Sequence, residues 1–310
     1  MLSVVIPAYN EAGAILQAVR GVGRVLHDAG ILYELIFVDD GSVDDTWKEI
    51  TLAAEQDSAV RGVSFSRNFG KEAAIFAGME AAAGDCCAVM DCDLQHPPEK
   101  LPEMYALWQQ GWEVVNGVKA DRGQESGFHR FAAKSFYKMM SKAVGIDMSQ
   151  ASDFKLMDRR VVKTLLALSE HKTFFRALAA WVGFHATEVA FHVEERTVGD
   201  THWSARSLFR YAVSNIASYS SAPMQIVTVL GALTLLLSLA LGVQTLINWV
   251  RGRAADGFTT VIILMLLIGS ILMISLGIIG YYIAQIFIEV KARPRYLVAR
   301  ACGQERGSRT

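Results

Sequence analysis

The pattern of apolar and polar residues changes partway along the chain. Over residues 1–203, short apolar runs alternate with stretches whose apolar residues recur at helical spacing, and charged residues occur throughout. The apolar runs cover residues 2–8, 33–38, 62–65, 86–90 and 113–117. Runs that alternate with helical patterns are typical of a mostly parallel sheet with helices on both faces. We therefore predict one α/β domain over residues 1–203.

Two long apolar stretches follow this domain. No charged residue lies between Arg210 and Arg251, or between Asp256 and Glu289. The hydrocarbon core of a membrane is about 30 Å thick and needs about 20 apolar helical residues. We therefore predict a transmembrane hairpin with helices over residues 223–250 and 257–290 and a short non-cytoplasmic loop at 251–256. Two buried helices of a soluble protein are the alternative, but buried helices of this length rarely lack every charge.

The segments that flank the hairpin set its predicted orientation. The tail, residues 291–310, begins with several basic residues close to the second span, and such residues are biased toward the cytoplasm. An even number of spans then places the α/β domain in the cytoplasm as well, at the inner (plasma) membrane. Residues 204–222 mix apolar and basic residues, which predicts an interfacial amphipathic helix, or alternatively a plain linker. Glycines within the spans favour packing between copies, so we expect a homo-oligomer.

Composition removes several other classes of protein. The chain of 310 residues has a net charge of −1 and no long basic block, so nucleic acid is not an expected partner. Its four cysteines, Cys86, Cys87, Cys92 and Cys302, have neither the spacing of a zinc site nor that of a disulfide framework. A reducing, cytoplasmic setting therefore fits the α/β domain.

Acidic residues gather directly after two predicted strands, where ligands bind in sheets of this kind. Asp39 and Asp40 follow the second apolar run, and Asp91 and Asp93 follow the fourth. Crowded carboxylates repel one another, so each pair needs a cation or a set of hydrogen-bond donors. A hard divalent cation prefers oxygen ligands and would offset the charge of a departing diphosphate. We therefore predict a divalent cation at Asp91 and Asp93.

Some neighbouring polar residues have an alternative role as helix caps. Asn10 can cap the helix that follows the first strand, and Ser42 can form a capping box with Asp45 before the next helix. Capping does not account for the paired carboxylates, so we keep both interpretations at this point.

Four segments in this order resemble the family 2 glycosyltransferases: SVVIPAYNEAG, IFVDDGSVDDT, SRNFGKEAAIFAGMEAAAGD and MDCDLQHPPE. The chain is most similar to the polyprenyl-phosphate members, of the dolichyl-phosphate mannose synthase and bactoprenol glucosyltransferase type. The resemblance extends over nearly the whole chain, including WVGF at residues 181–184, both apolar stretches and RPRYLV at 293–298. It implies a GT-A catalytic domain that transfers a sugar from a nucleotide donor to a polyprenyl phosphate with inversion.

The resemblance also implies which residues hold the nucleotide sugar and its ion. The nucleotide-sugar set is Pro7, Tyr9, Glu11, Asp39, Asp40, Ser42, Lys71, Asp91, Asp93, Gln95 and His202. Within it, Asp91, Asp93 and Gln95 would arrange a magnesium or manganese ion with the donor diphosphate. Two positions depart from the family, which often has lysine where His202 stands and arginine where Lys119 stands.

A second group of residues is predicted to serve the acceptor. A lipid phosphate is already anionic near neutral pH, so its main requirement is cations that hold two phosphates together. Lys119, Arg122, Arg130 and Lys134 follow the fifth strand and supply such cations, although a solvated basic face is the alternative. Asp153 matches an acidic position of the family near the acceptor, as a base or an orienting group. We assign catalysis to Asp93, Asp153 and Arg130.

The identity of the donor is not legible in any single residue. Overall likeness favours UDP-glucose and undecaprenyl phosphate, with UDP-N-acetylglucosamine or GDP-mannose as alternatives. A processive polysaccharide synthase is disfavoured because the chain has no Q-x-x-R-W motif. A function of another class is a non-catalytic membrane scaffold that binds nucleotide sugars and recruits a flippase, and a flippase is also a candidate partner of the enzyme.

Overall fold

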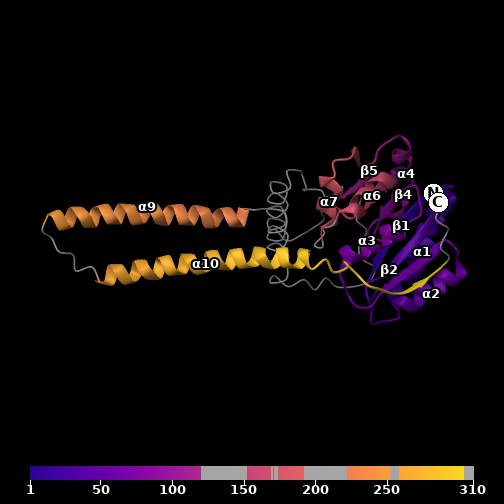
Figure 1. Cartoon of the computed structure of the whole chain (residues 1–310). Helices are drawn as coiled ribbons and strands as arrows, with labels where there is room; N and C mark the ends of the chain where they lie inside the picture. Colours follow the sequence, from indigo (N-terminus) through magenta and orange to yellow (C-terminus); the bar gives the residue numbers. More distant parts are fainter. Residues whose placement is uncertain (120–151, 169, 171–173, 192–221, 252–257, 304–310) are drawn as a thin grey trace. The chain divides into compact units, whose positions relative to one another are not determined.

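The computed structural model describes residues 1–119, 152–168, 170, 174–191, 222–251 and 258–303. The chain divides into two compact units, residues 1–204 with 294–310 and residues 205–293. Within the described residues, the first unit contains an eight-stranded sheet in the order β7-β5-β6-β4-β1-β2-β3-β8 (Figure 1). Most of its strand pairs are parallel, as the sequence predicts.

Five strands lie where the apolar runs predict them. They are β1 (Leu2–Ala8), β2 (Tyr33–Asp39), β3 (Val60–Phe65), β4 (Cys86–Val89) and β5 (Val114–Lys119). Strand β1 pairs in parallel with both β2 and β4, with Leu2 beside Tyr33 on one side and beside Cys86 on the other. Because these strands start level, their carboxyl ends reach the same edge of the sheet. The loops that carry the predicted polar residues therefore leave the sheet at one edge.

Three further strands have no clear signal in the sequence. Strand β6 (Lys155–Asp158) is antiparallel to both β4 and β5, and β7 (Ala186–Phe191) is parallel to β5. Strand β8 (Val298–Cys302) is antiparallel to β3 at the edge of the sheet. Strand β6 is only four residues long, and β8 is mostly exposed, so neither forms a long apolar run.

Helices cover both faces of the sheet. One face is covered by α1 (Ala12–Asp28), α2 (Thr46–Gln56), η1 (Pro98–Lys100) and α4 (Leu101–Gln109), and the other by α3 (Lys71–Ala81) and α6 (Arg159–Ala167). Alternate side chains of β1, Leu2, Val4 and Ile6, are fully buried in the core shared with α1. Val5 faces α3, where a Cβ on Gly78 would lie 2.2 Å from its Cγ1. Glycine is therefore required for this close approach. The short helix α7 (Phe175–Trp181) packs beside α6.

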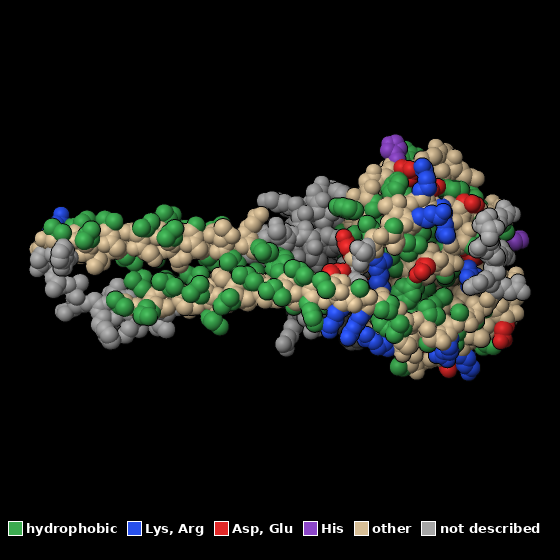
Figure 2. All heavy atoms as spheres, in the orientation of Figure 1, with side chains coloured by type: hydrophobic (Ala, Val, Ile, Leu, Met, Phe, Trp, Pro, Cys, Tyr) green, Lys and Arg blue, Asp and Glu red, His purple; other side chains and the backbone are tan. Residues whose placement is uncertain are grey.

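The second unit contains two long apolar helices, α9 (Ala222–Val250) and α10 (Phe258–Val290), which contact each other. They begin and end within one residue of the predicted spans. Each contains a segment long and apolar enough to cross a membrane, Val227–Asn248 and Leu267–Val290, with mean hydropathy 2.0 and 2.1. Their hydrophobic side chains are exposed along their length (Figure 2). The predicted interfacial helix lies outside the described residues, except for residue 222, where α9 begins.

Candidate active site

The loop after β2 uses both of its buried carboxylates for internal hydrogen bonds. Asp39 accepts hydrogen bonds from the backbone N–H of Ser42 at 2.9 Å and from the hydroxyl of Ser64 at 2.8 Å. Asp40 accepts from the backbone N–H groups of Phe69 and Gly70 at 2.7 and 2.9 Å. Burial raises the pKa of Asp40, although these amide donors lower it. Donors therefore satisfy this pair without a cation, and its contact with a nucleoside stays a prediction.

Gly41 allows the chain to turn between these residues and the next loop. Its φ is +68°, and a Cβ at this position would lie 2.4 Å from the carbonyl carbon of Arg67. Both the left-handed conformation and the backbone contact exclude a larger residue. The loops after β2 and β3 are thereby held against each other.

The predicted caps are wrong in their details. Ser42 accepts a hydrogen bond from the N–H of Asn10 at 2.9 Å, and the side chain of Asn10 accepts one from Val43 at 3.0 Å. These bonds link the loops after β1 and β2. The start of α2 is instead bonded by Asp44, which accepts from the backbone N–H of Thr46 at 3.0 Å. At the start of α1, the backbone N–H groups of Glu11 and Ala12 donate to the side chains of Thr46 and Asp44, because the loops after β1 and β2 lie at the same sheet edge.

The loop after β4 carries the acidic triplet, which consists of Asp91, Cys92 and Asp93. Asp93 accepts a hydrogen bond from the backbone N–H of Gln95 at 3.1 Å, which closes a tight turn around Leu94. Leu94 has φ +57°, a left-handed conformation that is uncommon for a residue other than glycine. His96 is buried, and its Nδ1 accepts a hydrogen bond from the backbone N–H of Asp91 at 3.1 Å. The histidine is therefore neutral in this arrangement and fixes the backbone of the triplet.

His96 in turn packs against two aromatic side chains. Its ring stacks on Phe154 with a centroid distance of 5.0 Å, and it meets Phe191 edge-on at 5.7 Å. Burial lowers the pKa of His96, which is consistent with its neutral form. The acidic loop thus packs on residues of, or next to, β6 and β7, two of the strands that the sequence did not predict.

Glu11 meets the acidic loop from the side of β1. Burial above all, together with the nearby carboxylates of Asp93 and Asp91, raises the pKa of Glu11 to about 7, although a hydrogen bond donated by the thiol of Cys92 lowers it. The Oε2 atom of Glu11 is buried and has no hydrogen-bond partner among the residues that the structure describes. Buried carboxylate oxygens are normally paired, so a crowded acidic group of this kind suits a cationic ligand.

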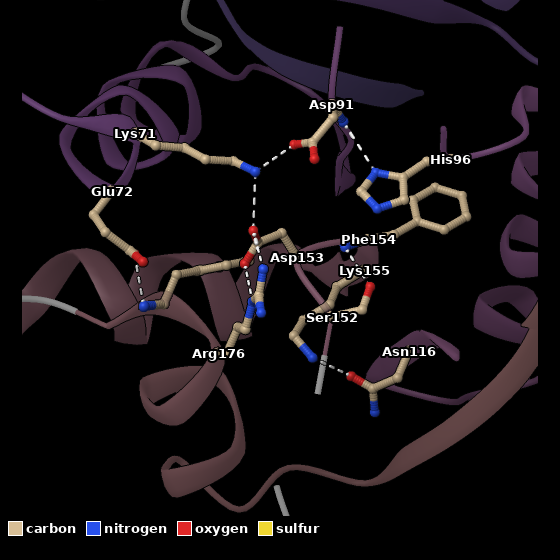
Figure 3. A network of polar contacts seen from close by, with 11 residues as sticks. Lys71, Glu72, Asp91, His96, Asn116, Ser152, Asp153, Phe154, Lys155 and Arg176 are labelled. Carbon is tan, nitrogen blue, oxygen red and sulfur yellow. Dashed lines mark hydrogen bonds and ion pairs between the residues drawn. The ribbon is translucent and has the colours of Figure 1, made fainter. Parts of the chain in front are cut away.

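A lysine at the start of α3 joins the acidic loop to a carboxylate on the other side of the site. The ammonium of Lys71 lies 2.6 Å from Oδ1 of Asp91 and 3.0 Å from Oδ2 of Asp153 (Figure 3). Although 43% of its side chain is exposed, the charged end lies between the two carboxylates. Burial alone would lower the pKa of Lys71, but Asp91 and Asp153 together raise it. Lys71 is therefore a permanent positive charge in this site.

Asp153 also forms an ion pair with Arg176 of α7. Nε of the guanidinium lies 2.7 Å from Oδ1, and Nη2 lies 2.8 Å from Oδ2, so the pair is bidentate (Figure 3). Asp153 is only 5% exposed. Burial would raise its pKa, but Arg176 and Lys71 hold the pKa well below its usual range. Asp153 therefore remains ionised at neutral pH and binds protons weakly.

A second lysine lies deeper, two residues along the chain from Asp153. Lys155 is 4% exposed, and its ammonium donates a hydrogen bond of 2.6 Å to the side-chain oxygen of Asn116 on β5. Burial lowers the pKa of Lys155 to about 8. This bond adds a side-chain link between β6 and β5, where Lys155 and Asn116 are paired.

The structure brings together only some of the predicted site residues. It brings Glu11, Lys71, Asp91, Asp93 and Asp153 into one cluster. Pro7 is buried within β1, and Tyr9 beyond its end is 46% exposed. Lys119 is exposed at the end of β5. Arg122, Arg130, Lys134 and His202 lie outside the described residues.

Four residues of the cluster were not predicted. They are Glu72, His96, Lys155 and Arg176. A signal existed for Arg176, which is the single charge in the apolar segment FFRALAAW, and for Lys155, whose neighbours Phe154, Leu156 and Met157 are apolar. A charge surrounded by apolar residues usually has a buried partner. Nothing in the sequence shows that this partner is Asp153.

Comparison with known proteins identifies the family of the chain. The glycosyl transferase family 2 model matches residues 3–166. An uncharacterized glycosyltransferase of Synechocystis is 37% identical over 306 residues, which cover 98% of this chain and 96% of the relative. The bactoprenol glucosyl transferase of Shigella phage SfII is 33% identical over 302 residues, covering 97% and 98%. A prophage bactoprenol glucosyl transferase homolog of Escherichia coli is 33% identical over 301 residues, covering 96% and 98%.

Among solved structures, glucosyl-3-phosphoglycerate synthase from Mycobacterium tuberculosis, in complex with Mn²⁺, UDP-glucose and phosphoglyceric acid, is similar with a TM-score of 0.49. It is 20% identical, and the match covers 70% of this chain and 77% of that one. The family match spans more than half of the chain, and the relatives match nearly all of it. The chain therefore belongs to glycosyl transferase family 2, as a glycosyltransferase of the bactoprenol glucosyl transferase type.

Proposed function

We propose that the enzyme transfers glucose from UDP-glucose to a polyprenyl phosphate, with inversion, at the cytoplasmic face of the membrane. Glucosyl transfer to a lipid carrier is supported by relatives named bactoprenol glucosyl transferase. The observation that carries the finer proposal is the state of Asp153, whose carboxylate is held by Arg176 and Lys71.

The ion pairs of Asp153 favour an acceptor that needs no base. A carboxylate held at a low pKa by two cations is a poor proton acceptor, and a sugar hydroxyl would need a base with a pKa near the working pH. A lipid phosphate is already an anion and attacks without losing a proton. Asp153 would then act as an orienting group, which keeps the cations Lys71 and Arg176 in place. The phosphate acceptor and the described geometry thus agree.

The acidic loop supports use of a divalent cation with the donor. Among the residues that the structure describes, no three His, Cys, Asp or Glu side chains form a ready metal cage. Magnesium usually takes only one or two carboxylates from the protein and completes its shell with phosphate oxygens and water. Asp93, Asp91 and Gln95 fit that pattern, and the buried carboxyl group of Glu11 lies beside the two aspartates. Such an ion, when bound with the donor, would offset charge on the departing diphosphate.

The remaining donor and acceptor contacts follow the family resemblance. Pro7, Tyr9 and Asp39 lie at the carboxyl ends of β1 and β2, where a nucleoside would bind in this fold. Lys119 ends β5 at the same sheet and would meet the acceptor phosphate. Arg122, Arg130 and Lys134 would join it, and His202 would contact the donor phosphates.

The membrane helices support a lipid acceptor. A polyprenyl tail leaves the bilayer only at a cost of about 0.8 kcal/mol per methylene. An enzyme for such an acceptor must work at the membrane, and α9 and α10 provide anchoring segments of sufficient length. We propose two spans, with the catalytic unit and the C-terminus in the cytoplasm, because basic residues such as Lys291 and Arg293 follow the second span.

The test is turnover by the purified full-length protein in nanodiscs. The donors are UDP-glucose, UDP-N-acetylglucosamine and GDP-mannose, and the acceptor is undecaprenyl phosphate. We expect glucosyl lipid from UDP-glucose with Mg²⁺, with the opposite anomeric configuration from the donor by NMR. Undecaprenol, which has a hydroxyl in place of the phosphate, is the matched control and should give no product. Binding of nucleotide sugar without turnover of any donor would refute the proposal and favour a scaffold.

A further inference from the structure

Two consecutive residues at the start of α3 reach the same carboxylate by different routes. Lys71 contacts Asp153 directly, as described above. Glu72 points instead toward α7, where its Oε2 accepts a hydrogen bond of 2.7 Å from the backbone N–H of Phe175 (Figure 3). The bond joins residues 103 positions apart in the sequence. It therefore holds one element of the site against another.

The bond from Glu72 acts as a helix cap supplied from outside the helix. Helix α7 begins at Phe175, and the preceding residue, Phe174, makes no side-chain cap hydrogen bond. The first N–H groups of a helix have no partner within it, and a carboxylate is favoured there. Burial, with a contribution from Asp153, raises the pKa of Glu72 to about 7. The carboxyl group is thus buried at an energetic cost, where it accepts a backbone N–H at the start of α7.

The residue that follows the capped amide is Arg176. Its guanidinium meets Asp153 through two parallel hydrogen bonds, which require both a fixed distance and a fixed plane. A small shift of the first turn of α7 would break one or both bonds. The cap and the bidentate pair are therefore mechanically linked through a single peptide unit.

We propose that Glu72 is a positioning residue, which holds the first turn of α7 so that Arg176 remains bidentate on Asp153. Glu72 acts through Arg176 and does not touch the substrate. The proposal rests on the proposed function in one respect, because it assumes that Asp153 orients groups around the acceptor phosphate. The start of α3 would then hold the carboxylate of Asp153 in two ways, directly through Lys71 and indirectly through Glu72 and α7.

The test uses glutamine and methionine at position 72 in the full-length protein. Glutamine keeps a carbonyl oxygen that accepts from Phe175, whereas methionine has no comparable acceptor. We expect Glu72→Gln to stay within about 3-fold of wild-type kcat, and Glu72→Met to lose about 10-fold, the effect of losing one cap. The KM for the nucleotide sugar should change by less than about 2-fold in both, because the donor contacts are elsewhere. Glu55→Gln, at an exposed position of α2, is the matched control.

A double-mutant cycle with Arg176→Met separates this role from a direct one. If Glu72 acts through Arg176, Glu72→Met should cost less than about 2-fold in the Arg176→Met background. An unchanged 10-fold loss in that background, or a loss in Glu72→Gln equal to that in Glu72→Met, would overturn the proposal. The melting temperatures of the same four proteins should show the same coupling. Absence of turnover in the wild type would refute the proposed function, while the melting cycle would still decide the link between the two residues.

Discussion

Replacing Arg176 with methionine tests the ion pairs at the centre of the site. Methionine keeps the length and most of the apolar volume of the side chain but removes the guanidinium. Asp153, which is 5% exposed, would then lose hydrogen bonds of 2.7 and 2.8 Å and keep the ion pair of 3.0 Å to Lys71. The carboxylate would be left buried with only part of its compensating charge.

The expected loss of stability follows from this burial. Removing one partner of a buried ion pair costs about 3 to 5 kcal/mol. Because Arg176 is 29% exposed and Lys71 remains in place, we take the lower limit, about 3 kcal/mol. A domain of this size shifts its melting temperature by about 2 to 4 °C for each kcal/mol. Arg176→Met should therefore lower the melting temperature of the catalytic unit by about 6 to 12 °C.

The measurement is thermal unfolding of the detergent-solubilised full-length protein, followed by tryptophan fluorescence between pH 4 and pH 8. Since Arg176 and Lys71 lower the pKa of Asp153 below its ordinary value of 3.8, its contribution to stability is present above that value. It is lost only as the pH falls through the lower, folded-state pKa. The difference between wild type and variant should therefore be constant from pH 8 to pH 5.

A surface arginine provides the matched control. Arg160 also contacts two carboxylates, Glu113 at 2.8 Å and Asp158 at 3.4 Å, but its side chain is 73% exposed. Exposed ion pairs contribute about 0 to 1 kcal/mol, so Arg160→Met should lower the melting temperature by no more than about 4 °C. The reasoning would be refuted if the Arg176 variant melted within about 2 °C of the wild type, or if both variants lost the same stability.

Three further predictions concern the acidic loop, the deeper lysine and the turn after β2. Asp93→Asn keeps the oxygen that accepts from the N–H of Gln95 but removes a charge from the predicted ion site. Turnover should therefore fall at least about 100-fold, with little change in melting temperature. Near-normal turnover would exclude this ion site. Burial lowers the pKa of Lys155 from 10.5 to about 8, so the folded state gains stability as the pH rises between these values. The melting temperature of the wild type should accordingly rise relative to Lys155→Met from pH 7.5 to pH 10, and a difference independent of pH would contradict the assignment. Gly41→Ala should lower the free energy of unfolding by at least about 2 kcal/mol, because the alanine must adopt a left-handed φ and its Cβ would lie 2.4 Å from the backbone of Arg67. The measurement is denaturant unfolding, and an unchanged midpoint would contradict this role of Gly41 in the turn.

The parts of the fold that the sequence predicts are those coded by local pattern. Strands β1 to β5 and helices α9 and α10 each coincide with a mainly apolar run in the sequence, and their ends were predicted within two residues. Strand β8 has no such run, because it lies at an exposed sheet edge in a basic tail and gains its partner from β3. Its existence depends on a pairing between residues far apart in the chain, which no local pattern records.

The residues of the site also differ in how far the sequence predicts them. The position of Asp91 and Asp93 follows from one rule about strand ends, because both residues sit in the loop directly after β4. The pairing of Asp153 with Lys71 and Arg176 joins three separate segments of the chain, and no local pattern shows which carboxylate pairs with which cation. For Asp39 and Asp40, the sequence shows two adjacent carboxylates but not their partners. In the structure they accept hydrogen bonds from residues of β3 and of the loop after it.

Strand β8 has a consequence for the order in which the protein is made. The catalytic unit consists of residues 1–204 and 294–310, so the hairpin is an insertion within it and not an appendage at its end. The ribosome releases β8 only after both apolar helices have been synthesised. Until then, the edge of β3 that β8 will cover stays open, and an open strand edge invites pairing with other chains. The sheet is therefore completed only after α9 and α10 have been synthesised, and a chain that stops before β8 keeps this strand edge open.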